Sequence, residues 1–333
     1  MSYLYINENG STLSLEAGYF IVKTKDDQIQ KIPKETLESI GLFGNVSLTT
    51  PCIKECLNRK IPVCYFSSSG YYFGKLESTR NGNIFRLKQQ IRMSENPQFT
   101  LGFSKKIISA KIHNQITILK RYNRTAGAMV DNEIITMKNA AQKLKISQSI
   151  EQVIGHEGNA SRSYFQALAK IIDPQFAFDG RNRMPPQDPF NAMISFGYTI
   201  LLNEIYGELE NRGLTPYAGF LHQDKERHPT LASDLLEEWR ALIVDSTVLS
   251  MIQGHEVEPA DFEKEDNGGI ILKKNARQRF LKCLELKMHG EMNYLSYVSE
   301  KTSFRKAIWL QVGELVKAIE KADYNLYEPI RVR

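Results

Sequence analysis

Cysteine is scarce in this chain of 333 residues, which contains only four. Cys52 and Cys56 form a C-x-x-x-C pair, and no similar pair follows downstream. A structural zinc site usually needs four well-spaced ligands, so this pair is a poor basis for one. The pattern favours reduced, mostly buried thiols, as in a cytoplasmic protein.

Long apolar runs and targeting segments are also missing. No stretch approaches the roughly 20 apolar residues that cross a bilayer. The N-terminus, MSYLYINENGS, has neither the basic region nor the apolar region of a signal peptide. We therefore expect a cytoplasmic protein with no membrane partner.

The excess of positive charge is small, because 43 Lys and Arg residues face 38 Asp and Glu residues. The formal net charge of +5 permits an anionic partner without requiring one. Hydrophobic residues make up 42% of the chain and charged residues 24%, which is an ordinary globular composition. The length suits one large domain or, more typically, two.

The sequence contains two regions of different periodicity. Residues 1–83 hold short β-type runs, among them YLYI, VSLTT, PVCYFS and YYFGKLE, with glycine and serine between them. From residue 84 onward, apolar residues recur at three- and four-residue spacing, which indicates helices. We predict an α+β protein with a small N-terminal β-sandwich-like domain (1–83) and a large all-α domain (84–333). The tail YNLYEPIRVR is expected to be flexible.

A cluster of acids follows a histidine in the segment GFLHQDKERHPTLASDLLEEWR, residues 219–240. On a helix, Asp234, Glu237, Glu238 and the later Asp245 fall on one face, where like charges repel. Solvent, a partner surface or a metal ion can offset that repulsion. A solvated acidic face near a helix N-terminus is the simpler explanation. His222 follows apolar residues, and a histidine in that setting is more often a core or capping residue than a ligand.

Two further segments carry unusual residues. In IGHEGNASRSYFQALA, Glu157 lies between two glycines on an otherwise good helix, and each glycine costs about 1 kcal/mol relative to alanine. That cost suggests that other backbone approaches closely around Glu157. In RNRMPPQDPF, Arg181 and Arg183 precede a proline pair. They form either a phosphate clamp or a rigid loop whose arginines pair with surface carboxylates.

Four blocks occur in this order: GHEGNASRSYF, RNRMPPQDPFNAMISFGYTILL, GLTPYAGFLH and LASDLLEEWR. Together they resemble the signature blocks of the CRISPR-associated endonuclease/integrase of the adaptation module, the universal spacer-acquisition protein family. The resemblance covers essentially the whole chain. It implies an N-terminal β-domain for dimerisation and a helical, metal-dependent catalytic domain with a DNA-binding surface.

The resemblance implies a divalent-metal site made of Glu157, His222 and Glu237, with Asp234 at or near the metal as a fourth catalytic residue. Carboxylates that share a pocket raise each other's pKa unless a cation is present. Carboxylate oxygens with one imidazole suit Mg²⁺ or Mn²⁺. A metal held there can activate water for hydrolysis or a DNA 3′-hydroxyl for strand transfer.

The same resemblance implies double-stranded DNA as substrate, both a captured fragment and a repeat array. It also implies a homodimer and a small adaptation partner protein that bridges two dimers. The basic segment KKIISAKIHNQITILKRYNR forms either a solvated face or a surface that follows a DNA backbone. The candidate DNA contacts are Lys105, Lys106, Lys120, Arg121, Arg162, Tyr164, Arg181 and Arg183.

The leading hypothesis is an integrase/endonuclease that joins the 3′-hydroxyl ends of captured DNA fragments, or spacers, to the repeat array by transesterification. Two alternatives stay open. A structure-selective endonuclease of DNA repair would cut branched DNA without the partner or the repeat. A non-catalytic DNA-binding scaffold would need neither a metal nor Glu157 and Glu237.

Overall fold

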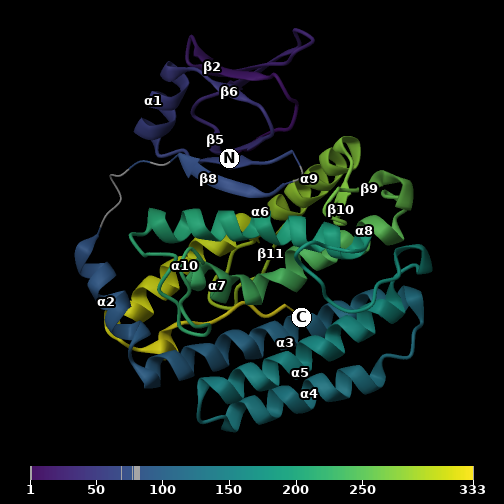
Figure 1. Cartoon of the computed structure of the whole chain (residues 1–333). Helices are drawn as coiled ribbons and strands as arrows, with labels where there is room; N and C mark the ends of the chain where they lie inside the picture. Colours follow the sequence, from purple (N-terminus) through teal and green to yellow (C-terminus); the bar gives the residue numbers. More distant parts are fainter. Residues whose placement is uncertain (1, 69, 77, 79–82, 333) are drawn as a thin grey trace. The chain divides into compact units, whose positions relative to one another are not determined.

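The computed structural model describes residues 2–68, 70–76, 78 and 83–332. The chain forms two compact units, Met1–Asn81 with Leu272–Leu281, and Gly82–Ile271 with Lys282–Arg333. Strands dominate the first unit and helices the second, which confirms the predicted α+β class (Figure 1). The predicted boundary between residues 83 and 84 directly follows residues 79–82, which lie outside the described part of the chain.

Two four-stranded sheets and one helix, α1 (Thr50–Arg59), build the N-terminal unit. The first sheet has the order β1 (Ser2–Ile6), β5 (Leu37–Phe43), β7 (Val63–Phe66) and β8 (Tyr72–Leu76). In it β1 and β7 lie parallel to β5, and β8 is antiparallel to β7. The second sheet has the order β4 (Ile29–Pro33), β3 (Tyr19–Lys23), β2 (Thr12–Glu16) and β6 (Ser47–Leu48). These sheets agree with the sandwich-like architecture expected from the alternating sequence.

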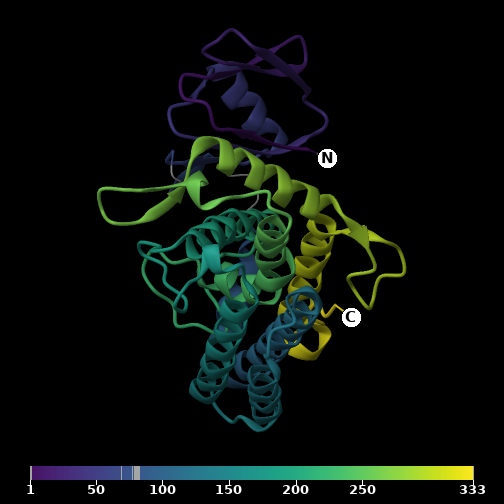
Figure 2. The same cartoon turned by 90° about the vertical axis from the view of Figure 1, so that its right-hand side faces the viewer.

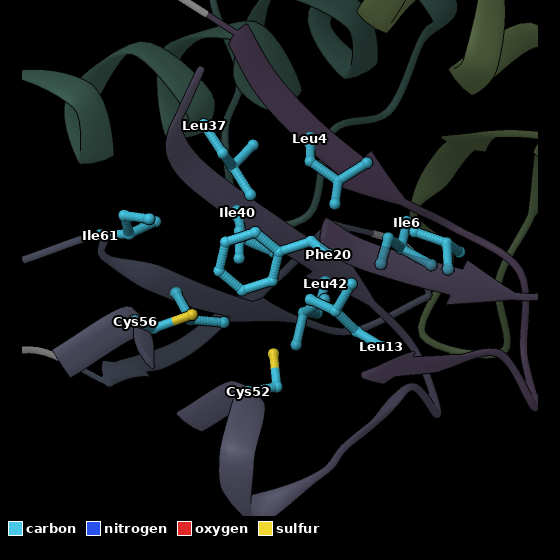
Figure 3. Close-up of a cluster of buried hydrophobic side chains, with 12 residues drawn as sticks. Leu4, Ile6, Leu13, Phe20, Leu37, Ile40, Leu42, Cys52, Cys56 and Ile61 are labelled. Carbon is cyan, nitrogen blue, oxygen red and sulfur yellow. The ribbon is translucent and has the colours of Figure 1, made fainter. Parts of the chain in front are cut away.

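The core of this unit is apolar and includes two of the cysteines. Figure 3 shows Phe20 gathered with apolar side chains of the first sheet, and Cys52 and Cys56 of α1 beside them. Leu13, Phe20, Ile40, Cys52 and Cys56 are all completely buried. Both thiols therefore behave as small apolar core residues, as predicted.

The second unit is mainly helical. Its helices are α2 (Ile84–Ser94), α3 (Pro97–Ala126), α4 (Asp131–Ile146), α5 (Ile150–Ile171), α6 (Pro189–Asn211), α7 (Thr230–Arg240), α8 (Ser246–Gln253) and α10 (Phe304–Lys321), while α9 (Lys274–His289) is divided between the units. Within the residues described here, none of the helices has both the length and the apolarity needed to cross a membrane.

Two small sheets interrupt the region that the sequence predicts as entirely helical. They pair β9 (Phe262–Lys264) with β10 (Ile270–Leu272) and β11 (Glu291–Met292) with β12 (Thr302–Ser303). Strands of two or three residues are too short to show an alternating pattern, which is why periodicity alone misses them.

Three long helices, α3, α4 and α5, run side by side in this unit (Figures 1 and 2). The Asn96 side chain caps α3 by accepting hydrogen bonds of 3.0 Å from the backbone N–H groups of Gln98 and Phe99. Gly127, with a φ of 62°, ends the helix in the left-handed conformation. Because α3 contacts both α5 and α7, a side chain from its middle can reach both of them.

Helix α7 carries the acids of the 219–240 segment through the interior of this unit. All its residues from Thr230 to Trp239 are buried, because α7 packs against α3 and α6. A π turn, Ala241–Asp245, follows directly and leads into α8. A π turn holds one more residue than an α-helical turn, so the faces before and after it are offset.

The C-terminal tail, expected to be flexible, is instead packed against α3 and α7. Tyr327 and Ile330 are completely or almost completely buried. Asn114 of α3 donates to the carbonyl oxygen of Ile330 at 2.9 Å, and the Ile330 N–H donates to Glu238 Oε2 at 2.8 Å. The chain end beside α3 in Figure 1 is therefore part of the core. The apolar residues of this short tail follow no regular spacing, so the sequence does not show that it is buried.

Candidate active site

A cavity of about 840 Å³ opens in the helical unit, between α3, α4, α5, α6, α7 and the loops that precede α6 and α7. Glu157 of α5, His222 of the loop before α7 and Glu237 of α7 all line it. These residues lie far apart in the sequence, and the fold brings them to one cavity. Their role as metal ligands stays a prediction.

Lys111, from the middle of α3, lies between the two carboxylates. Its ammonium is ion-paired with Glu157 Oε1, and it lies 2.7 Å from Glu237 Oε2. Arg240, three residues after Glu237 on α7, places Nη2 3.0 Å from Glu237 Oε1. No three His, Cys, Asp or Glu side chains in the described ranges are grouped closely enough to hold a metal ion. The Lys111 ammonium therefore occupies the space between the carboxylates of Glu157 and Glu237.

The charged groups around Lys111 keep one another ionised. Burial raises the pKa of Glu237, but Arg240 and Lys111 outweigh it, and the pKa falls to about 2. Burial acts in the same direction on Glu157, and the Lys111 ammonium again brings the pKa below its ordinary value. Burial favours the neutral amine of Lys111, yet the two carboxylates raise its pKa. Two carboxylates and two cations therefore form a group without net charge, in which Lys111 and Glu237 are buried and Glu157 and Arg240 are partly buried.

The donor set nevertheless fits Mg²⁺ or Mn²⁺ in its chemistry. Two carboxylates and one imidazole are ligands that both ions accept, and the imidazole nitrogen favours Mn²⁺. Glu237 Oε2 is buried, and its contact with Lys111 is not aligned as a hydrogen bond, so this oxygen keeps electron pairs for a ligand-metal bond. An ion held here would have to share the carboxylates with Lys111.

Asp234 fixes the position of His222. Its Oδ1 lies 2.7 Å from His222 Nδ1, and its carboxylate accepts the backbone N–H groups of Phe220, Leu221 and His222 at 2.7, 2.9 and 3.2 Å. The hydrogen bond to Asp234 raises the pKa of His222, although burial opposes it. Asp234 is completely buried and does not line the cavity, so the structure makes it a positioning residue for the imidazole rather than a group that touches substrate.

Gly219 allows the loop to approach α7 this closely. A Cβ atom at this position would lie 2.7 Å from Asp234 Oδ2 and 2.4 Å from Thr230 Cγ2. Contacts this short do not occur in folded proteins, so a side chain at Gly219 would push the loop away from Asp234. Close packing against α7 therefore explains why the segment 219–240 begins with a glycine.

The acids of α7 do not share one face, contrary to the prediction from helical spacing. Glu237 lines the cavity, whereas Glu238 accepts hydrogen bonds from the Tyr327 hydroxyl and the Ile330 N–H on the side of the C-terminal tail. Burial raises the pKa of Glu238 to about 8. After the π turn, Asp245 points in a third direction, toward the hydroxyls of Tyr164 and Tyr198. The repulsion among these acids is therefore relieved by separate partners, and neither solvent nor one shared ion explains it.

Tyr164 does not lie on the surface, so its prediction as a DNA contact is wrong. Its side chain is completely buried, and its hydroxyl donates to Asp245 Oδ2 at 2.7 Å. The Tyr198 hydroxyl donates to Asp245 Oδ1 at 2.6 Å. The Tyr198 ring in turn lies 5.6 Å from the Arg181 guanidinium carbon and 5.0 Å from that of Arg240. Through Asp245, Tyr164 therefore helps to fix the environment of Tyr198, over which Arg181 and Arg240 lie.

Four arginines are among the described residues that line the cavity: Arg162, Arg181, Arg183 and Arg240. Arg181 donates to Asn191 Oδ1 at 2.8 Å and to Ser195 Oγ at 3.0 Å, which fixes its guanidinium. Arg183, the second arginine of the phosphate-clamp interpretation, also lines the cavity, and so does Arg162. Six cationic side chains and four carboxylates are found among the described lining residues, so the cavity favours an anionic ligand.

The basic residues of α3 are dispersed, and of those that the structure describes only Lys111 lines the cavity. Lys106 donates to the carbonyl oxygens of Asn325 and Tyr327 at 2.8 and 2.7 Å, so it holds the tail and is a poor candidate for DNA. Lys105 reaches the Lys145 carbonyl oxygen at 3.3 Å. Lys120 and Arg121 are exposed, and their predicted contact with DNA stays a prediction.

The glycines beside Glu157 are not explained by packing, contrary to expectation. A Cβ atom added at Gly155 or Gly158 would meet nothing within 4 Å. Both are exposed, and only Gly158 of the two lines the cavity. The open space beside Gly158 leaves room for a ligand to approach the backbone of α5.

Sequence reasoning missed Lys111, Arg240 and Tyr198 as parts of the site. A signal for Lys111 was present, because it shares a helical face with Ile107, Ile108 and Ile118 at spacings of four, three and seven residues. A lysine within an apolar stripe needs a buried partner of opposite charge. Taken as a whole, the basic segment predicts a solvated face or a DNA-binding surface, and neither interpretation separates Lys111 from the other lysines.

Two ionised carboxylates, an oriented imidazole and a set of arginines in one cavity define a class of site suited to phosphodiesters. The family described as CRISPR associated protein Cas1 matches residues 4–286. The CRISPR-associated endonuclease Cas1 of Mycobacterium tuberculosis is 37% identical over 321 residues, which cover 96% of this chain and 94% of that protein. The chain belongs to the Cas1 family.

Solved structures share the fold. A CAS1 protein from Thermotoga maritima has a TM-score of 0.82 at 23% identity, with 96% of this chain and 97% of that chain covered. A chain of a Cas6-RT-Cas1–Cas2 complex has a TM-score of 0.84 at 25% identity. That likeness covers 100% of this chain and 36% of the other, longer chain.

Proposed function

We propose that this protein is a divalent-metal-dependent DNA endonuclease and integrase that joins 3′-hydroxyl ends of captured fragments to a repeat array. The observation that carries the proposal is the meeting of Glu157, Glu237 and His222 in one arginine-lined cavity. The relatives named CRISPR-associated endonuclease support phosphodiester chemistry. The carboxylates themselves argue against a scaffold, since a scaffold has no use for two ionised acids beneath a DNA surface.

Glu157, Glu237 and His222 are the residues that would hold Mg²⁺ or Mn²⁺. When bound, such an ion supplies Lewis-acid chemistry: it makes a hydroxyl oxygen a better nucleophile and stabilises charge on the phosphodiester. Asp234 keeps Nδ1 of His222 engaged at 2.7 Å, which leaves Nε2 as the ligand nitrogen. The protein thus offers a ligand set whose imidazole orientation is fixed before any ion arrives.

Arg181 and Arg240 would bind the phosphodiester that reacts. Both guanidinium groups are held over the Tyr198 ring, and Tyr198 is anchored by Asp245. Fixed guanidinium groups neutralise the charge that develops on phosphate oxygens as the attacking oxygen bonds to phosphorus and the leaving oxygen departs. Water as the attacking group gives cleavage, and a DNA 3′-hydroxyl gives strand joining. The same residues serve both reactions.

The partners follow from the same proposal. A structural neighbour is part of a complex that contains Cas1 and Cas2, so we expect a small protein partner for this chain as well. A homodimer formed through the N-terminal unit would place two sites at the two ends of one fragment. Double-stranded DNA is the expected substrate of each site.

The test combines a short duplex with free 3′-hydroxyl ends, a supercoiled plasmid that carries repeats, Mn²⁺ or EDTA, and the purified protein with or without the partner. Glu157→Gln should lower joining roughly 100-fold or more. Glu133→Gln is a matched control, because Glu133 lines the same cavity but pairs with Lys170 at 2.6 Å. It should join normally. Nicking without joining would favour the repair nuclease, and DNA binding without either reaction would favour the scaffold.

A further inference from the structure

The ion-paired group at the centre of the cavity has an unusual composition for a metal site. Lys111 contacts both carboxylates, whereas Arg240 contacts Glu237 alone. The Lys111 side chain is 6% exposed and that of Glu237 is 5% exposed. Its neighbours on α3, Ala110 and Ile112, are buried as well. The Lys111 ammonium therefore belongs to the interior and is held there by the two acids.

The charges of this group are already balanced. Glu157 and Glu237 supply two negative charges, and Lys111 and Arg240 supply two positive ones. The His222 imidazole has its own partner in Asp234. A divalent ion that joined the group would add two positive charges with no anion to compensate them. An uncompensated charge in a buried place is strongly unfavourable.

DNA supplies the missing negative charge. A phosphodiester carries one charge per phosphate, and the cavity wall already presents Arg181 and Arg183 to such groups. Each phosphate near the group offsets one of the two positive charges that the ion adds, so binding of the ion is less unfavourable with DNA present than without it. Binding of the ion and binding of DNA should thus favour each other, and by equal factors, because coupling between two ligands is reciprocal.

We propose that Lys111 is an internal counter-ion that makes divalent-metal binding conditional on DNA: weak in the free protein and tight in the complex. This rests on the metal site of the proposed function and goes beyond it by giving Lys111 a role. Lys111 is the residue responsible because, of the described cations in the cavity, it alone contacts both proposed ligand carboxylates. The consequence is a site that stays without metal until its substrate is in place.

The experiment measures Mn²⁺ affinity of the full-length protein from the electron paramagnetic resonance signal of free Mn²⁺. It is done with and without a duplex whose 3′ ends lack the hydroxyl, so that no joining occurs. The duplex should tighten Mn²⁺ binding of the wild type by at least about tenfold. Lys111→Met should bind Mn²⁺ at least about tenfold more tightly than wild type without DNA, and the effect of the duplex should shrink. Lys317→Met, which breaks the ion pair with Glu314 on α10 and lies outside the cavity, should behave like wild type.

Equal or weaker Mn²⁺ binding by Lys111→Met without DNA overturns the proposal, and so does a wild type indifferent to the duplex. Lys111→Met leaves two acids facing each other, so its folding is monitored by thermal unfolding. Rescue of its stability by Mn²⁺ supports the proposal, since the ion then replaces the lost charge. If Lys111→Met does not fold, Lys111→Arg is used in its place, because it keeps the positive charge. Mn²⁺ binding by Lys111→Arg must then depend on the duplex as it does in the wild type. Loss of this dependence overturns the proposal.

Glu157→Gln separates this inference from the proposed function. If Mn²⁺ binding is absent in wild type with DNA, the metal site itself is wrong, and the role of Lys111 falls with it. If Glu157→Gln abolishes Mn²⁺ binding while Lys111→Met leaves it unchanged, the metal site stands and only the counter-ion role is overturned.

Discussion

At the scale of single residues, each buried acid of the helical unit has its own set of partners. Glu237 faces Lys111 and Arg240, Glu238 faces the tail, and Asp234 faces the loop that carries His222. A buried carboxylate without such partners would be costly. Neighbouring acids in sequence can therefore have unrelated roles, and substitutions should separate them.

Asp234→Asn should disturb the His222 imidazole without emptying the space that Asp234 fills. The amide can still accept from the backbone of Phe220 and Leu221, but it has no charge to hold the ring. Residues that orient metal ligands typically change metal affinity by about 10- to 100-fold when altered. We expect a loss of that size in Mn²⁺ affinity, measured with DNA present.

Ser233→Ala is a control for this variant, because Ser233 precedes Asp234 on α7 and contacts His228 instead. Its Mn²⁺ affinity should match that of wild type. Unchanged affinity in Asp234→Asn would mean that the orientation of His222 does not depend on the Asp234 charge.

At the scale of the elements, the helices that build the site were predictable and their ends and neighbours were not. Apolar spacing placed helices from residue 84 onward, and the resemblance singled out Glu157, His222 and Glu237. The π turn and the buried tail gave no periodic signal, so the directions of Glu238 and Asp245 could not be read from the sequence. The position of Lys111 within an apolar face of α3 indicated that it is buried. Its partners could not be predicted, because they depend on which helices pack against α3.

Helix α5 offers a direct test at this scale. Alanine at Gly155 or Gly158 meets open space, so each substitution should stabilise the protein by about 0.5–1 kcal/mol. Gly158 alone of the pair lines the cavity. We expect Gly158→Ala to impair DNA joining while Gly155→Ala leaves it intact, with both melting at or above the wild-type temperature. Equal joining by the two variants would remove the argument that a ligand approaches the backbone at Gly158.

The C-terminal tail can be tested through the Tyr327 hydroxyl. Tyr327→Phe removes the donor to buried Glu238 Oε1, and a buried acceptor left without its partner costs about 1–3 kcal/mol. Urea unfolding should show a loss of that size. Tyr217→Phe is the matched control, because its hydroxyl is in an exposed pair with Tyr206, and it should change stability by less than about 0.5 kcal/mol. Equal effects would show that the tail contributes little.

At the scale of the whole molecule, buried acids with raised pKa values make stability depend on pH. Burial raises the pKa of Asp245 above 3.8, and the hydroxyls of Tyr198 and Tyr164 only partly oppose it. The folded protein thus binds this proton more tightly than the unfolded chain. The resulting stabilisation is complete below pH 3.8 and is lost as the pH rises through the folded pKa of Asp245.

Asp245→Asn isolates this contribution. The difference in unfolding free energy between wild type and Asp245→Asn should decrease as the pH rises from about 4 to 9, because only the wild type loses a bound proton on unfolding. Urea titrations at several pH values measure it. A difference that is constant or increases with pH would contradict a raised pKa for Asp245.

The π turn at Ala241–Asp245 makes the length of this stretch matter as much as its composition. Successive residues on a helix are about 100° apart, so removing one residue here would rotate everything downstream on α8 by that angle. Asp245 would leave the two tyrosines that it anchors, and the arginines stacked on Tyr198 would lose their support. At the apolar positions 241–244 the chain should therefore tolerate exchange of side chains far better than any insertion or deletion.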